Sequence, residues 1–227
     1  MDFPASNSDR EVPVDVKCNI TKVMEIDMPD LDSSIFKINL PTGKPAVGSL
    51  LVAEPFLREE YFNHGVISLV EYERGKSAMG LVLNKATGYT LGEAIEGIQD
   101  EIDIPIYCGG PLSCDRLFYL HSLGDEFRGA RKIAEDLYIG GDFKQVKSYV
   151  NMGLETEGKM RFFVGYSGWD PMQLEEEIEK HVWAVAPKPA NKEIFMEDGD
   201  SSWYRIVRLL GKPYRNWLYH PVNPQYN

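Results

Sequence analysis

The sequence predicts a single α+β domain, and three observations support that prediction. Short apolar runs typical of strands recur along the chain, and capped helical segments stand between some of them. The two kinds of element do not follow the regular β-α-β order of a doubly wound sheet. At 227 residues, the chain can form one sizeable core. Residues 1–34 lack a long periodic element and are predicted to be a loosely ordered extension, which leaves residues 35–227 for the domain.

Three strands are predicted in the first part of the domain, over residues 48–53, 66–72 and 78–84. The second and third runs flank the short polar loop ERGKS, which is the pattern of a β-hairpin. A helix is expected after Thr90, because Glu93 stands three residues further on and completes a capping box.

Strands and helices remain mixed in the second part of the domain. Asp142 is expected to cap a helix that ends at Gly153. The last helical piece, SSWYRIVRLLG, is expected to close at Gly211 and Pro213. Further strands are predicted over four apolar runs, the first two of which are separated by a Gly-Gly-Pro turn: residues 104–110, 117–122, 136–141 and 160–166.

The stretch GWDPMQLEEEIEKHVW has a structural interpretation as a helix start. Asp170 is predicted to be the N-cap, with Pro171 at the first helical position and Gln173 reaching back to the cap. Trp169 and Leu174 would then be the two partners of a hydrophobic staple. A ligand site in the same stretch is the alternative interpretation.

No catalytic residue is assigned from the sequence. Ser167 lies in GYSGW, where Trp169 occupies the place of the second glycine of a G-x-S-x-G nucleophile elbow. The four histidines never pair at i,i+4 and no CxxC occurs, so neither a metal nor another cofactor is expected. His121 is interpreted as a half-buried hydrogen-bonding residue rather than as a catalytic base.

Cysteine usage and hydropathy indicate a cytoplasmic protein. No apolar run approaches the ~20 residues that cross a bilayer, and the start of the chain resembles no secretory signal, so no membrane association is expected. Cys18, Cys108 and Cys114 form a sparse set that fits a reducing compartment. The last two flank the Gly-Gly-Pro turn, and small buried thiols are the default interpretation for them.

Charge is distributed unevenly along the chain. The formal net charge is -11, which disfavours direct binding to DNA. From Ser201 to the end there is no acidic residue, and this segment is expected to dock on the acidic body or to form a solvated helix face. The alternative is a patch for a polyanion or an acidic partner, formed by Arg205, Arg208, Lys212 and Arg215.

Several stretches together resemble the YqgE/AlgH family of bacterial proteins, among them GSLLVAEPFLREEYFNHGVISLVEY, AMGLVLNK, YCGGPLSCDRLFYLHS and FFVGYSGWDPMQLEEEIEKHVWAVAP. The resemblance implies an α+β fold with a branched, partly barrel-like sheet surrounded by helices. It also implies a cytoplasmic protein without an established biochemical activity, of a kind often labelled a transcriptional regulator. The family's recurrent positions correspond here to Asn84, Gly109, Gly110, Pro111, Arg116, His121, Gly165, Gly168, Trp169, Gln173, Leu174 and Glu175.

Two function classes follow, besides direct DNA binding through the basic segment. The first is a non-enzymatic regulatory or interaction protein whose partner is a protein rather than nucleic acid. The alternative is a small-ligand-binding protein or enzyme with a pocket near Asn84, His121 and Trp169. Candidate ligand-binding residues for that pocket are Asn84, Gly109, Gly110, Arg116, His121, Ser167, Trp169 and Gln173.

Overall fold

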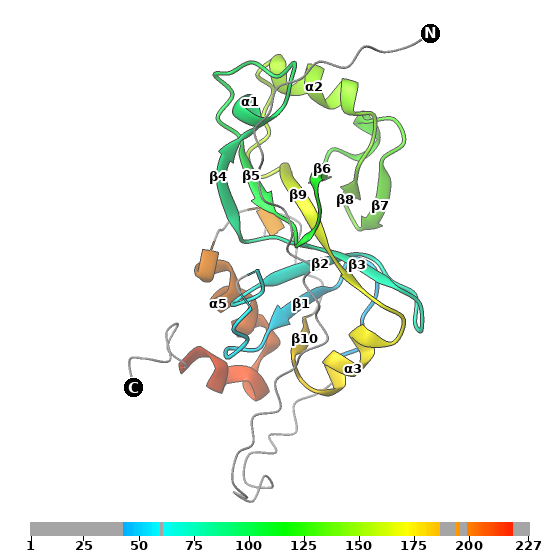
Figure 1. Cartoon of the computed structure of the whole chain (residues 1–227), viewed down its shortest axis with the longest axis vertical. Coiled ribbons are helices and arrows are strands. Elements are labelled where there is room, and N and C mark those ends of the chain that lie inside the picture. Colours follow the sequence, from blue (N-terminus) through cyan, green and yellow to red (C-terminus); the bar gives the residue numbers. More distant parts are fainter. Residues whose placement is uncertain (1–42, 60, 187–193, 196–198, 220–227) are drawn as a thin grey trace, which may run out of the picture. The chain divides into compact units, whose positions relative to one another are not determined.

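The computed structural model describes residues 43–59, 61–186, 194–195 and 199–219 (Figure 1). The predicted extension over residues 1–34, and Cys18 within it, lie outside the described residues. The elements in chain order are β1 Leu50–Ala53, β2 Val66–Glu71, β3 Ala78–Val82, β4 Ala86–Thr90, α1 Leu91–Ala94, β5 Pro105–Cys108, β6 Leu112–His121, η1 Gly124–Glu126, β7 Arg131–Ala134, β8 Leu137–Ile139, α2 Phe143–Asn151, β9 Met160–Trp169, α3 Gln173–Glu179, β10 Trp183–Ala186, α5 Gly199–Leu210 and η2 Lys212–Tyr219.

The strands form one branched and mostly antiparallel sheet, as the predicted fold class requires. Its main path runs β10-β1-β2-β3-β9-β6-β8-β7. A branch leaves this path at β9, which also pairs with β5, and β5 pairs with β4 on its other side. Among the described pairs, only β5 with β9 is parallel. The strands β4 and β7 were not among those that the sequence predicted.

The branch point is β9, which is longer than predicted. Its first half pairs with β5 on one side and with β6 on the other, so that Phe163 faces both Tyr107 and Phe118. Its last residues pair with β3, where Trp169 faces Ala78 and Ser167 faces Gly80. The strand was expected to end at residue 166, but this second pairing extends it to Trp169.

Alternating side chains of β1 enter different cores, as the two-residue period of a strand dictates. Leu50 and Val52 belong to a core cluster with Trp203 and Val207 of α5. Leu51 and Ala53 belong to a second cluster that includes residues of α3. The strand is therefore buried on both faces, and α3 and α5 cover opposite faces of it. A third cluster packs α1 and α2 against β5 and β9.

Two helix starts agree with the predicted capping. Thr90 and Glu93 form the complete capping box of α1. Asp142 caps α2 by accepting a hydrogen bond from the Lys144 amide at 2.9 Å. At the other end of the chain, α5 stops at Leu210 as expected, although the chain does not leave helical structure at Pro213, because η2 continues to Tyr219.

The predicted N-cap at Asp170 is wrong. Because β9 runs to Trp169, residues 170–172 form a turn, and α3 begins only at Gln173 after Met172, which has a left-handed φ of 70°. Within the described residues, no side chain caps this helix. Only the reverse half of the capping box exists, since the Asp170 amide donates to Oε1 of Gln173 at 2.9 Å.

Candidate functional site

Asn84 is a buried crosslink between β2, the end of β3 and the start of α5. Its Oδ1 accepts a hydrogen bond from the Val66 amide at 2.9 Å. Its Nδ2 donates to the carbonyl oxygens of His64, at 2.9 Å, and Gly199, at 2.8 Å. The Gly199 amide completes the connection by donating to the Asn84 carbonyl. These contacts use the donors of the amide side chain within the fold, so its position is explained by structure.

The His64 ring lies beside this crosslink and was not among the predicted site residues. It is fully buried and stacks on Trp203, with ring centroids 4.3 Å apart. Its Nδ1 lies 3.3 Å from Oδ1 of Asp200, the second residue of α5. Burial lowers the pKa of His64, although the Asp200 carboxylate acts in the opposite direction.

The Gly-Gly-Pro turn and the Ser-Gly-Trp stretch are adjacent, but their backbones touch directly. A Cβ on Gly110 would lie 2.3 Å from the Tyr166 carbonyl carbon, and one on Gly109 would lie 2.3 Å from the Gly165 oxygen. Ser167 is buried and its Oγ donates to the Gly109 carbonyl at 3.1 Å. These glycines permit a close approach of two chain segments, and no space for a ligand separates them here.

His121 ends β6 inside an aromatic cage. Its ring stacks on Tyr138 with centroids 5.6 Å apart and meets the edge of Phe127 at 5.0 Å. Its Nε2 lies 3.1 Å from the Gly140 carbonyl, and Nδ1 has no hydrogen-bond partner. The ring is fully buried rather than half-buried as predicted, while the expected hydrogen bond is present. Burial lowers the pKa of His121.

The two buried histidines predict that acid destabilises the fold. Their folded-state pKa values lie below the unfolded value of about 6.5, so the unfolded chain binds more protons between the two values. Their contribution to stability is therefore complete above about pH 6.5 and is lost as the pH falls toward the folded pKa. The maximal slope is about 1.4 kcal/mol per pH unit for each histidine. Urea unfolding at a series of pH values across this range gives the free energy of unfolding as a function of pH. That free energy should change less steeply with pH for His121→Phe than for wild type, and an unchanged pH dependence would contradict the assignment to His121.

A carboxylate on α3 collects three hydrogen bonds around the predicted Trp169. Oε2 of Glu177 accepts from the indole nitrogens of Trp169, at 2.8 Å, and Trp183, at 2.7 Å. Its Oε1 accepts from Nε2 of Gln173 at 2.9 Å. Glu177 therefore joins β9, α3 and β10. The predicted residues Trp169 and Gln173 do come together, but through Glu177, which was not among the predicted site residues.

Replacing Glu177 by alanine is expected to lower the free energy of unfolding by about 2 kcal/mol, because two largely buried indole N–H groups lose their charged acceptor. Urea denaturation followed by tryptophan fluorescence measures the effect, and native emission should shift to the red. Glu179→Ala on the exposed face of α3 is the control and should change stability by less than about 0.5 kcal/mol. Equal effects of the two substitutions would contradict the assignment.

The remaining predicted residues lie on the surface of other elements. Arg116 is exposed on β6, in the irregular section between the paired residues Leu112 and Leu117. Arg208 on α5 is exposed, as are Lys212 and Arg215 on η2, whereas Arg205 is half-buried. Among the described residues, no hydrogen bond or ion pair joins Arg116, Arg208, Lys212 or Arg215 to Asn84, His121 or Trp169.

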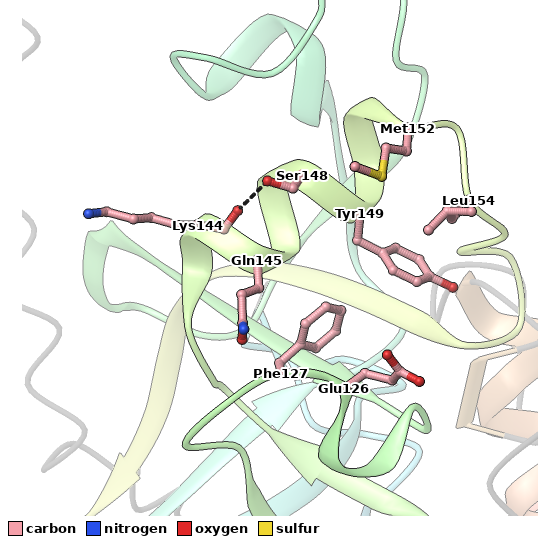
Figure 2. A pocket seen from close by; sticks show the side chains of 8 residues that line it. All are labelled: Glu126, Phe127, Lys144, Gln145, Ser148, Tyr149, Met152 and Leu154. Carbon is pink, nitrogen blue, oxygen red and sulfur yellow. Dashed lines mark hydrogen bonds between the residues drawn. The ribbon is translucent and has the colours of Figure 1, made fainter.

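A cavity of about 340 Å³ lies between α2 and the segment that begins with η1 (Figure 2). The rings of Phe127 and Tyr149 meet edge to face there, at 5.6 Å. Met152 and Leu154, both largely exposed, lie at one end of the cavity. Its lining includes none of the predicted ligand-binding residues, and it consists of Glu126, Phe127, Lys144, Gln145, Ser148, Tyr149, Met152 and Leu154.

The structure thus separates the residues of the predicted pocket. Asn84 contacts the first residue of α5, His121 lies in the aromatic cage, and Trp169 is hydrogen-bonded to Glu177. No contact found among the described residues joins these three side chains to one another. Ligand binding by this set stays a prediction. In the described part of the chain, no cluster of three histidine, cysteine or acidic side chains could hold a metal ion. No helix among these residues is both long and apolar enough to span a bilayer.

The fold defines a class of α+β proteins in which a curled, mostly antiparallel sheet forms a half barrel with several helices. A family model described as AlgH-like matches residues 50–215. A UPF0301 protein of Parabacteroides distasonis is 42% identical over 195 residues, which is 86% of this chain and 98% of that protein. Another, from Bacteroides thetaiotaomicron, is 36% identical over 198 residues and covers 87% of this chain and 100% of its own.

Two solved structures share the fold. A crystal structure of a protein from Corynebacterium diphtheriae has a TM-score of 0.64 at 22% identity, covering 80% of this chain and 96% of that one. The solution structure of the AlgH protein from Pseudomonas aeruginosa has a TM-score of 0.60 at 26% identity, covering 79% of this chain and 97% of that one. The chain belongs to the AlgH-like family, and the predicted resemblance is confirmed.

Proposed function

We propose that this protein is a non-enzymatic interaction protein that binds an acidic protein partner through one basic face of α5 and η2. The observation that carries the proposal is a set of exposed cations, Arg208, Lys212 and Arg215, without an ion pair among the described residues. We call this set the basic face. Arg208 lies in the last turn of α5. Lys212 and Arg215 lie three residues apart on the 3-10 helix η2, where side chains at i and i+3 project from the same side.

The composition of this region supports a protein partner. The opposite side of α5 is buried through Trp203, Ile206 and Val207, which fixes the direction of the exposed side. On the same two elements, Leu209 of α5 is 46% exposed and Tyr219 of η2 is 76% exposed. Cations next to exposed apolar and aromatic side chains suit an acidic peptide surface with apolar residues better than a uniform phosphate backbone. The overall charge of -11 adds repulsion toward nucleic acid.

Charge reversal tests the proposal. Replacing Arg208, Lys212 and Arg215 by glutamate should weaken binding to a labelled acidic peptide that contains leucine by at least about tenfold, measured by fluorescence anisotropy. Added salt should weaken wild-type binding in the same assay. The matched control makes the same change of charge at three exposed cations outside α5 and η2, through the substitutions Arg74→Glu, Arg128→Glu and Lys132→Glu. Equal loss in both triple variants, or tighter wild-type binding to a short DNA duplex than to the peptide, would overturn the proposal.

A second candidate function, binding of a small molecule, is favoured by the cavity beside α2. This cavity is wide open to solvent, and it combines an aromatic pair with the polar side chains of Gln145 and Ser148. Ser148→Phe would fill part of this space. Fragments that bind the wild type in ligand-observed NMR should lose their signal with this variant if the cavity is the site, and unchanged signals would exclude it.

A further inference from the structure

Two thiols lie on either side of the Gly-Gly-Pro turn and approach the same backbone oxygen. Cys108 ends β5, and Cys114 lies near the start of β6. The sulfur of each lies 3.8 Å from the same atom, the carbonyl oxygen of Gly110. The two sulfurs are therefore separated by at most twice that distance. The chain between them contains two glycines, Gly109 and Gly110, so the fold places both thiols around one carbonyl group of this turn.

The environments of the two thiols differ. Cys114 is exposed, which corrects the prediction of two small buried cysteines, whereas Cys108 is half-buried. Burial raises the pKa of the Cys108 thiol, and the neighbouring Cys114 acts in the same direction. Because the thiolate is the nucleophile, Cys108 is the slower of the two toward a reagent in solution. Gly165 lies under Cys114, and a Cβ there would be only 3.4 Å from its sulfur, so the absent side chain leaves that sulfur room.

We propose that Cys108 and Cys114 form a thiol–disulfide exchange site for low-molecular-weight disulfides of the glutathione type. The Cys114 thiolate attacks one sulfur of the disulfide and expels one glutathione thiolate, which leaves a mixed disulfide on Cys114. Cys108 then loses its proton, attacks the Cys114 sulfur and expels the second glutathione. Two protein thiols are oxidised by two electrons, one disulfide is reduced to two thiols, and the two protons end on the glutathiones.

The resulting disulfide would close a ring around the turn that holds the branch of the sheet together. Within that ring, the Gly109 carbonyl accepts hydrogen bonds from the Val82 amide and from Ser167 Oγ. The Gly109 amide donates to the Val164 carbonyl. Oxidation would thus act where β3, β5 and β9 meet, independently of the basic face.

The test uses the full, reduced chain incubated with glutathione disulfide, quenched with acid, alkylated and mapped by mass spectrometry. The mass of the wild-type chain should fall by two hydrogens, and the new disulfide should map to Cys108 and Cys114. Cys108→Ser should instead hold a lasting glutathione adduct on Cys114. Cys114→Ser should leave Cys108 reduced, with adduct formation at least about tenfold slower than at Cys114. Cys18→Ser is the matched control and should behave as wild type.

Two results would overturn the proposal. The first is a glutathione adduct on Cys114 that persists in wild type to the same extent as in Cys108→Ser, since Cys108 would then not resolve it. The second is a disulfide that includes Cys18 in place of either thiol. Far-UV circular dichroism checks that the serine variants fold, and Cys108→Ala replaces Cys108→Ser if that variant does not.

Discussion

Replacing Gly110 by alanine is expected to cost at least about 4 kcal/mol of unfolding free energy, enough to leave little folded protein. Two effects add. The added Cβ would lie 2.3 Å from the Tyr166 carbonyl carbon and 2.4 Å from the Ser167 amide nitrogen, and both are backbone atoms that cannot rotate away. The φ of +148° at Gly110 is also one that side-chain-bearing residues rarely adopt. Soluble yield and urea denaturation measure the loss.

Gly140→Ala is the matched control for this substitution. Gly140 has a positive φ of +69°, but a Cβ there meets nothing within 4 Å. Alanine at Gly140 should therefore cost only the backbone strain, about 1 kcal/mol. If both variants lose stability equally, the close approach of the turn to β9 is not what requires glycine at Gly110.

Replacing Asn84 by alanine should lower the free energy of unfolding by about 3 kcal/mol. The substitution removes two buried hydrogen bonds and one partly buried one, and it leaves the Val66 amide and the carbonyl oxygens of His64 and Gly199 without this partner. Because one of these bonds reaches α5, the loss should also loosen that helix. Urea denaturation measures the total loss of unfolding free energy, and hydrogen exchange of the α5 amides measures how far that helix is loosened.

Asn63→Ala is the control for Asn84. Asn63 donates a single, partly buried hydrogen bond to the Leu57 carbonyl, which lies in the same loop. Its replacement should cost about 1 kcal/mol and should leave exchange in α5 unchanged. A loss at Asn84 no larger than at Asn63 would contradict the crosslink.

The sequence predicted the features that depend on neighbouring residues. The hairpin of β2 and β3, the capping box at Thr90 and the cap at Asp142 each arise from signals within a few positions of one another. The predicted cap at Asp170 failed for a tertiary reason. Pairing of Trp169 with Ala78 extends β9 through the positions that local capping rules assign to the helix start.

The candidate site was less accessible to sequence reasoning. Asn84 was predicted as a site residue, but its partner Gly199 is 115 residues away, so its structural role could not be inferred. Glu177 was missed, although its i,i+4 spacing from Gln173 placed both on one helical face. The cavity beside α2 depends on how α2 packs over Phe127, and no motif marks it.

The position of β9 in the chain has a consequence for the order of synthesis. β3, β5 and β6 each have one edge that is completed only by β9, and all three precede it. Until the ribosome has released residues 160–169, these earlier strands carry open edges that other chains could pair with. The nascent protein is therefore most exposed to wrong association while the greater part of its length is already made.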